Sequence, residues 1–329
     1  MVSQLPNGRD SPRTDASSTS TEGAVATARD RSARFSVGDE PGVAADRPVR
    51  VPLNAGNVAA VHPIERLRYV ARANGVSHAL AVRESAAAMR SFAHDPHALV
   101  TACRRMIDRQ PGIAPLWWLG ARLLTAPDAA VEIRRVLDDL AHDSTVRELE
   151  FALPADAIVC VIGWPDLVGE ALLRRGDLHV FVVDAHGEGR GFAARLVQAD
   201  VACDDVPVEG MTQAIAASDL LVLEASAACP ATCLAVAGSF AAAAIARRLE
   251  VPVWIALGEG RLLPASLYRA LVERAGLDIE PWRHDDEPVP VDLLDIAIGP
   301  KGMRDAAVAF GDVTCPVAPE LVKDRRDID

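Results

Sequence analysis

From residue 154 onward, short runs of apolar, often β-branched residues alternate with longer alanine-rich runs, and this alternation constrains the fold more than any other feature. Apolar residues at helical spacing separate the short runs, which lie at residues 157–162, 178–183, 220–223, 253–257 and 293–298. Strands that are apolar throughout are typical of a parallel sheet covered by helices on both faces. The sequence therefore predicts an α/β fold with a doubly wound parallel sheet.

The chain before residue 154 consists of a segment without apolar periodicity, followed by segments with helical spacing. Residues 1–60 are rich in Ser, Thr, Gly, Asp and Arg and lack apolar periodicity, so they cannot bury enough surface to offset the entropy of ordering. Helical spacing begins after Pro63 and contains no convincing strand before Pro154. The predicted domains are a disordered tail at 1–60, a helical N-terminal domain at 61–150, the α/β domain at 151–315 and a charged C-terminal tail at 316–329.

Charge and hydropathy exclude several classes of function. The formal net charge of −12 repels polyanions, and no local basic face offsets it, so nucleic acid is not an expected partner. The longest apolar stretches, such as residues 241–246, are too short to span a bilayer, so no membrane is expected either. The N-terminus has no basic cluster leading into an apolar run, which predicts a cytoplasmic protein with reduced thiols.

No metal ion and no cofactor is predicted. Cys229 and Cys233 form a CxxxC pattern, but the second ligand pair that a zinc site needs is absent. Gly187, Gly189 and Gly191 follow a predicted strand, as in a dinucleotide-binding turn, yet the full GxGxxG spacing is missing. A tight turn into a helix explains these glycines without NAD.

The predicted site lies where the strands end, because ligands of doubly wound folds bind beyond the carboxyl ends of the strands. Glu224 and Ser226 follow the run at 220–223, and a carboxylate that interrupts an apolar run must find a partner or reach solvent. A helix-capping or loop role explains Glu224 equally well. Gly238 and Ser239 begin an alanine-rich helix whose N–H groups could bind an anion, although helix packing through small residues explains the same glycine.

A second group of candidate ligand-binding residues precedes the α/β region. Arg72, Asn74 and Gly75 lie at the junction of the first two predicted helices, where an arginine beside a turn could contact a phosphate. The ordinary alternative is a solvated arginine. The adjacent Trp117 and Trp118 are expected to pack helices together rather than to hold a ligand.

The order of these segments resembles the family that unites the alpha, beta and delta subunits of translation initiation factor 2B with the methylthioribose-1-phosphate and ribose-1,5-bisphosphate isomerases. The resemblance covers about residues 64–305. Its segments include RANG at 72–75, IVCVIGWPDLV at 158–168, ASDLLVLEAS at 217–226, AGSFAAAAIA at 237–246 and PVDLLDIAIGPKG at 290–302. It implies a helical N-terminal domain followed by a Rossmann-like doubly wound parallel sheet, and a homodimer formed through the latter.

The resemblance also implies that the isomerase chemistry is missing. The isomerases use a cysteine just beyond the first strand and an aspartate after a later one, and the matching positions here carry Ile162 and Ser226, with Cys160 inside the strand. Moving a proton between adjacent carbons requires a base, which an isoleucine and a serine do not supply.

The phosphate-binding motif of the isomerases is reduced as well. Their Asn-Lys pair is replaced by Ala235 and Val236, so that only Gly238 and Ser239 remain of the motif. Arg261 stands where members of the family often carry a second basic residue.

Three hypotheses follow from these observations. The leading one is an initiation factor 2B-like protein without catalytic activity, which binds a sugar phosphate or a nucleotide. The second is an isomerase-like enzyme with relocated chemistry, in which Glu224 is the base, Ser226 the hydroxyl donor, and Arg72 and Arg261 the phosphate ligands. The third is a structural subunit that functions only by assembling with itself or with a relative.

Overall fold

A computed structural model gives the structure of the chain, and it describes residues 78–322. The predicted tail at 1–60 and the candidates Arg72, Asn74 and Gly75 lie outside the described residues. The described part opens with helices, which are α2 (His78–Met89), η1 (Arg90–Phe92), α3 (Pro96–Arg109), α4 (Ala114–Thr125), α5 (Ala129–Ala141) and α6 (Thr145–Ala152).

The starts of these helices follow from local chemistry. Asp95 precedes α3, and its Oδ1 accepts hydrogen bonds from the backbone N–H groups of His97 and Ala98, both at 3.0 Å. Pro96 fits the first turn because that turn needs no N–H donor. Asp128 caps α5 in the same way. The predicted helices before residue 150 are therefore present within the described range.

The α/β region contains a seven-stranded sheet in the order β10-β9-β7-β4-β1-β2-β3. All neighbouring strands are parallel except β9 and β10, which form an antiparallel hairpin at one edge. This confirms the predicted Rossmann-like doubly wound sheet. The strands are β1 (Ile158–Ile162), β2 (His179–Asp184), β3 (Ala202–Pro207), β4 (Leu220–Glu224), β7 (Val253–Ala256), β9 (Ile296–Gly299) and β10 (Gly302–Asp305).

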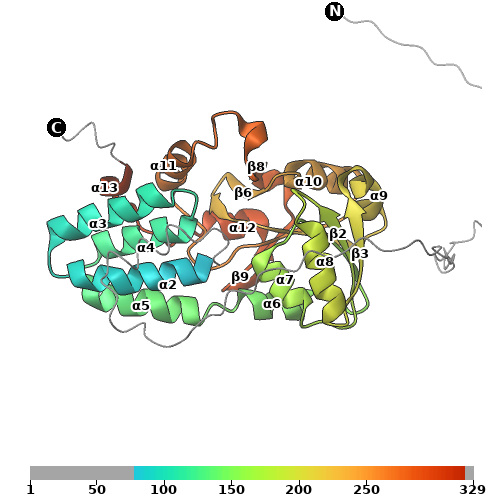
Figure 1. Cartoon of the computed structure of the whole chain (residues 1–329), viewed down its shortest axis with the longest axis horizontal. Coiled ribbons are helices and arrows are strands. Elements are labelled where there is room, and N and C mark those ends of the chain that lie inside the picture. The colour runs from blue at the N-terminus through green and yellow to red at the C-terminus, as the bar shows by residue number, and fades with distance from the viewer. Residues whose placement is uncertain (1–77, 323–329) are drawn as a thin grey trace, which may run out of the picture. The chain divides into compact units, whose positions relative to one another are not determined.

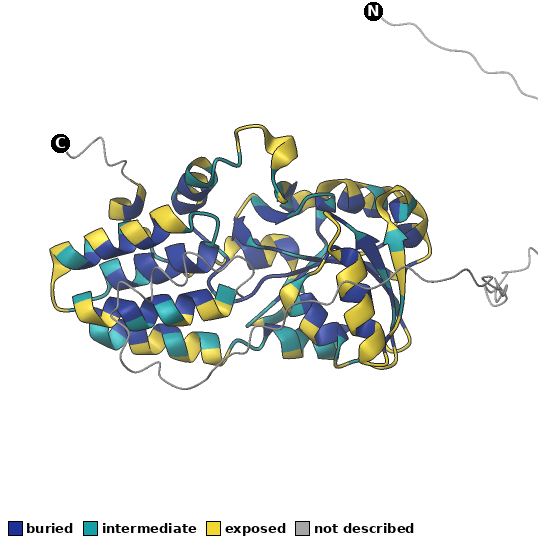
Figure 2. Cartoon of the chain, in the orientation of Figure 1, coloured by how far each residue is buried: buried dark blue, intermediate teal, exposed yellow. Residues whose placement is uncertain are grey.

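Helices cover both faces of this sheet (Figure 1). One apolar core joins the sheet to α6, α7 (Asp166–Leu172) and α8 (Gly189–Gln198). The opposite core joins it to α9 (Met211–Ala216), α10 (Ser239–Arg248) and α12 (Ala306–Gly311). Figure 2 shows the consequence, since the central strands β1, β4 and β7 are buried, whereas the edge strand β3 and the outer helix faces are exposed.

A second, three-stranded antiparallel sheet was not predicted. It has the order β5-β6-β8 and contains β5 (Ala227–Cys229), β6 (Thr232–Val236) and β8 (Asp286–Pro290). Gly238 has a φ of 103°, and α10 begins directly after this left-handed residue, at the place where the sequence analysis started the alanine-rich helix. β8 was not predicted because it contains Pro288 and Pro290. Proline removes a backbone donor and is therefore rare in strands, except at a sheet edge, where β8 lies.

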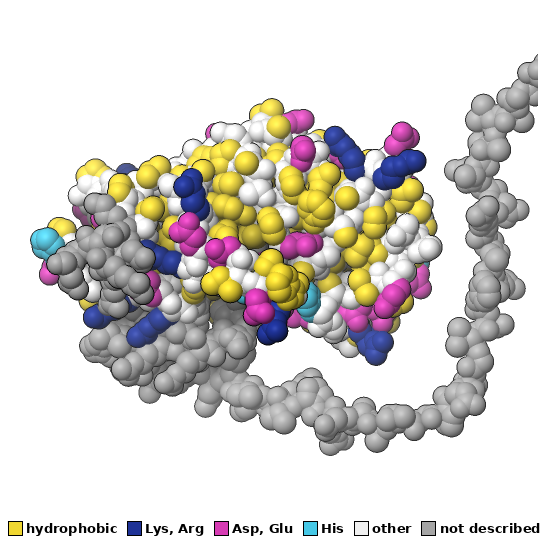
Figure 3. All heavy atoms as spheres, turned by 90° about the horizontal axis from the view of Figure 1, so that it is seen from above, with side chains coloured by type: hydrophobic (Ala, Val, Ile, Leu, Met, Phe, Trp, Pro, Cys, Tyr) yellow, Lys and Arg dark blue, Asp and Glu magenta, His cyan; other side chains and the backbone are white. Residues whose placement is uncertain are grey.

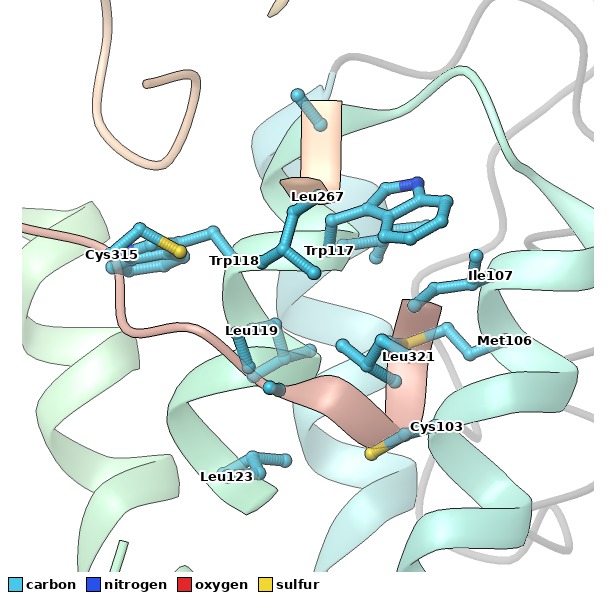
Figure 4. Close-up of a cluster of buried hydrophobic side chains, with 14 of the residues drawn as sticks. Cys103, Met106, Ile107, Trp117, Trp118, Leu119, Leu123, Leu267, Cys315 and Leu321 are labelled. Carbon is cyan, nitrogen blue, oxygen red and sulfur yellow. The ribbon is translucent and has the colours of Figure 1, made fainter. Parts of the chain in front are cut away.

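A third core connects the N-terminal helices with the end of the chain (Figure 4). Trp117 and Trp118 of α4 pack with Leu267 of α11 (Ala265–Ala275) and with Leu321 of α13 (Pro319–Val322). Ala318 and Leu321 are fully buried, so ordered packing extends into the range predicted as a charged tail. None of the helices within residues 78–322 has both the length and the apolar character of a membrane span.

Candidate functional site

A cavity of about 210 Å³ lies at the carboxyl ends of β1 and β4, where the sequence placed the site. The structure brings four of the predicted residues to its wall, namely Glu224, Ser226, Ser239 and Arg261. Gly238, which is not among the lining residues, precedes Ser239 at the start of α10. The strand ends therefore converge as predicted, although the partners of these side chains were not foreseen.

Glu224 is held by an arginine and by a helix. Its Oε1 accepts a hydrogen bond from Arg261 Nη1 at 2.7 Å, and its Oε2 accepts from the backbone N–H groups of Leu167 at 2.8 Å and Val168 at 3.1 Å. The carboxylate thus caps α7, as the alternative explanation of Glu224 proposed. Its assignment as a general base stays a prediction, and that role would require these contacts to break.

Arg261 is the deeply buried partner of this pair. The side chains of Arg261 and Glu224 are 6% and 11% exposed, and Arg261 Nη1 also donates to the backbone oxygen of Ala225 at 2.5 Å. The guanidinium is therefore neutralised inside the protein. Its assignment as a phosphate ligand stays a prediction as well.

Two further helix N-termini at this edge of the sheet bind carboxylates of the protein itself. Asp184 Oδ1 accepts from the N–H of Gly189 at 2.8 Å, at the start of α8. Glu287 Oε1 accepts from Gly238 at 2.7 Å and from Phe240 at 2.8 Å, at the start of α10. The N-terminus of a helix attracts anions, and at α7, α8 and α10 the bound anion is a carboxylate of the protein itself.

The cavity wall is acidic. Its described residues include five carboxylates, which belong to Asp166, Glu188, Glu224, Asp285 and Asp286, whereas Arg261 is the single guanidinium among them. His78 does not add a positive charge at neutral pH, because burial and the nearby Arg261 lower the pKa of His78 to about 4.

Asp286 is the carboxylate that the sequence reasoning missed most clearly. Ser226 Oγ donates a hydrogen bond to Asp286 Oδ2 at 2.7 Å. Burial, opposed by the Ser226 hydrogen bond, raises the pKa of Asp286 above its usual range. The acidic run Asp285–Glu287 was the available signal, but only the pairing of β8 with β6 brings this run to the site.

No thiol lines the cavity among the described residues. Cys160 is fully buried in the core beneath α10, and burial raises its pKa to about 12, whereas Ile162 lies at the cavity wall. Cys229 and Cys233 occupy non-equivalent register positions of the β5–β6 hairpin and therefore face opposite sides of it. Within residues 78–322, no group of three or more His, Cys, Asp or Glu side chains is arranged to hold a metal ion.

The cap formed by Glu287 leads to a testable prediction. Replacing Glu287 with alanine removes both hydrogen bonds to the start of α10, so the free energy of unfolding is expected to fall by about 1–2 kcal/mol. The vacated N–H groups can then donate hydrogen bonds to an anion. We therefore expect inorganic phosphate to raise the melting temperature of Glu287→Ala more than that of the wild type in a thermal-shift titration.

The control for this experiment is Asp95→Ala at the start of α3. That substitution removes a cap of the same kind, but the helix lies in the N-terminal bundle away from the cavity. It is expected to lower stability without a new response to phosphate. Equal phosphate responses in both variants would show that α10 has no special anion-binding position.

The fold is shared with subunits of a translation factor. A structure of eIF2B beta from Chaetomium thermophilum matches with a TM-score of 0.59 and 15% identity, covering 74% of this chain and 86% of that one. The translation initiation factor eIF-2B of Pyrococcus horikoshii OT3 matches with a TM-score of 0.59 and 11% identity, covering 75% and 98%.

A chain of the tetrameric eIF2B-beta2-delta2 complex from C. thermophilum matches with a TM-score of 0.62 and 14% identity, covering 76% of this chain and 92% of that one. These identities are too low to carry function, so the matches establish the fold, as the resemblance of the segments implied. No protein-family model and no curated protein sequence matches the chain.

Proposed function

We propose that this chain with the fold of the eIF2B subunits acts as a cytoplasmic assembly subunit without catalytic activity. The observation that carries the proposal is that carboxylates of the protein itself bind the helix N-termini at this site. Asp184, Glu224 and Glu287 bind the N-termini of three helices at the site, which are the positions where this type of sheet presents phosphate-binding N–H groups.

The same observation argues against the two other hypotheses. A sugar phosphate or nucleotide would enter a cavity whose described wall is acidic and whose guanidinium is paired with Glu224. An isomerase with relocated chemistry would require Glu224 to release α7 and Arg261 before it could accept a proton. An assembly role needs neither step.

Exposed apolar side chains support assembly with a second copy. Figure 3 shows hydrophobic atoms gathered on the face that lies above α10 and α11 in Figure 1. In α10 and in the segment that follows α11, Phe240 is 44% exposed, Ile279 is 67% exposed, and Trp282 of η3 (Pro281–Arg283) is 78% exposed. Large aromatic residues that protrude from a surface are typical anchors of protein interfaces.

Two measurements test this proposal. Incubation of the purified protein with ribose-1,5-bisphosphate and methylthioribose-1-phosphate is expected to give no isomerised product. Light scattering is expected to give twice the 34.9 kDa mass of the chain. Turnover would refute the absence of catalysis, and a monomeric mass at all concentrations would refute homodimerisation.

A matched pair of variants locates the interface. Trp282→Asp places a charge in the exposed apolar surface and is expected to shift the protein toward the monomer by at least tenfold in dissociation constant. Phe151→Asp is the control, because Phe151 is 76% exposed on α6, which packs on the other side of the molecule's main sheet from α10. If the Trp282→Asp protein stays dimeric and the Phe151→Asp protein does not, the interface lies at α6 instead.

A further inference from the structure

We propose that the cavity between Asp286 and Ser239 binds a small protonated amine and not a phosphate ester. The inference rests on the proposed function, because a sugar-phosphate isomerase would need an anion site at this place. The inference goes beyond the proposed function because it names a class of ligand, a protonated amine, whose positive charge suits the acidic wall.

The hydrogen-bonding capacity of the wall is mainly that of an acceptor. Asp286 uses Oδ2 for the hydrogen bond from Ser226, and its Oδ1 accepts no hydrogen bond from the described residues. Asp166, Glu188 and Asp285 also line the cavity and form no ion pair with Arg261, although Asp285 Oδ1 lies 3.8 Å from His186 Nδ1. A ligand that brings N–H donors and positive charge complements such a wall, whereas a phosphate would be repelled by it.

Two buried polar atoms at the cavity have no hydrogen-bond partner among the described residues. They are evidence for a ligand that does not depend on the charge of the wall. The Ser239 side chain is 0% exposed, lines the cavity, and its Oγ has no hydrogen-bond partner. His78 Nδ1 is also buried without a partner at the same cavity. Buried polar groups are almost always satisfied in native proteins, so these two atoms indicate a missing polar group.

His78 and Ser239 accept hydrogen bonds readily in this setting. The pKa of His78 is about 4, so its imidazole is neutral at pH 7 and offers one ring nitrogen as an acceptor. The Ser239 hydroxyl has two acceptor lone pairs. An ammonium group has three donors and no acceptor, so its hydrogen-bonding capacity complements acceptor atoms of Asp286, Ser239 and His78, which all line the cavity.

Size and composition narrow the ligand further. The cavity of about 210 Å³ is smaller than the ~300–1,000 Å³ of common ligand pockets, which favours a small molecule. A bare metal ion is a poor candidate, because the described residues include no metal-binding group of three or more His, Cys, Asp or Glu side chains. The inferred ligand is thus an organic amine such as a short diamine.

A four-carbon series tests the charge preference without changing the size of the probe. Putrescine, 1,4-butanediol and succinate carry positive, zero and negative charge on similar chains. In thermal-shift and calorimetric titrations of the full chain at pH 7, only putrescine is expected to bind and to raise the melting temperature. Ribose-5-phosphate serves as the phosphate-bearing probe and is expected to give no shift.

The decisive variant is Asp286→Asn. Loss of a charge-assisted hydrogen bond is expected to weaken putrescine binding about tenfold or more. Because the pKa of Asp286 is raised in the folded state, ionisation of Asp286 costs stability as the pH rises through that pKa. The neutral asparagine is therefore expected to leave the fold intact at pH 7, as circular dichroism can verify.

Asp292→Asn is the matched control, since Asp292 is exposed outside the cavity and its replacement changes the net charge equally. Equal putrescine affinities in the wild type and Asp286→Asn would overturn the inference. It would also be overturned by binding of ribose-5-phosphate in place of putrescine, or by no response to putrescine up to about 10 mM. These results are distinct from isomerase turnover or a monomeric mass, which would instead contradict the proposed function.

Discussion

Replacing Arg261 with methionine is expected to lower the free energy of unfolding by about 3–5 kcal/mol, because it leaves the carboxylate of Glu224 buried without its counter-ion. The loss includes the hydrogen bond from Arg261 Nη1 to the backbone oxygen of Ala225. Only the backbone N–H groups of Leu167 and Val168 would then hold the carboxylate. Denaturation in urea or guanidinium chloride measures the effect.

Two comparisons make this result specific. Arg247→Met breaks an ion pair with Asp295 in which the arginine is 54% exposed, and it is expected to cost no more than about 1 kcal/mol. The double variant Glu224→Gln with Arg261→Met removes both charges, and it is expected to be less destabilised than Arg261→Met alone. Equal losses for Arg247→Met and Arg261→Met would contradict the buried ion pair.

Replacing Trp117 with alanine is expected to cost about 3–5 kcal/mol, since a fully buried indole leaves a large cavity behind. Trp117 Nε1 also donates to the backbone oxygen of Pro111 at 2.8 Å, and this bond is lost. Figure 4 shows Trp117 among Leu267 and Leu321, so the cavity opens where α4, α11 and α13 meet. Equilibrium denaturation followed by circular dichroism measures the change.

The control for this prediction is Trp282→Ala. Trp282 is 78% exposed, so truncation in the monomer is expected to change stability by less than about 0.5 kcal/mol. The shared core further predicts that far-ultraviolet dichroism and tryptophan fluorescence of Trp117→Ala follow one transition. Two separated transitions would show that the helices around α4 unfold independently of the sheet.

The main sheet was predictable because each of its central strands is a short apolar run that can be recognised from neighbouring residues in the sequence. Short, continuous apolar runs such as residues 220–223 and 253–257, each followed by a longer helical run, are typical of strands buried on both faces, and the structure has β4 and β7 there. The edge hairpin of β9 and β10 was not predicted. It reverses direction over the two residues between Gly299 and Gly302, and Gly302 has a φ of 81°.

The candidate site was predictable in position but not in chemistry. Glu224, Ser226 and Arg261 meet at one cavity because parallel strands end at the same edge of the sheet. Their charge state depends on partners that no local pattern reveals. Ser226 and Asp286 are hydrogen-bonded across 60 residues of sequence, and Asp286 lies in a proline-containing strand that sequence rules disfavour.

The sequence by itself determined the alternation of strands and helices, the position of the candidate residues at the strand ends, and the absence of a thiol at position 162, because each depends on residue type and short-range spacing. Only the tertiary structure decided that Glu224, Asp184 and Glu287 bind helix N-termini and that the cavity is acidic. Hydrogen bonds and ion pairs between distant segments depend on which side chains folding brings within about 3 Å of one another, and the linear order of residues does not state those distances.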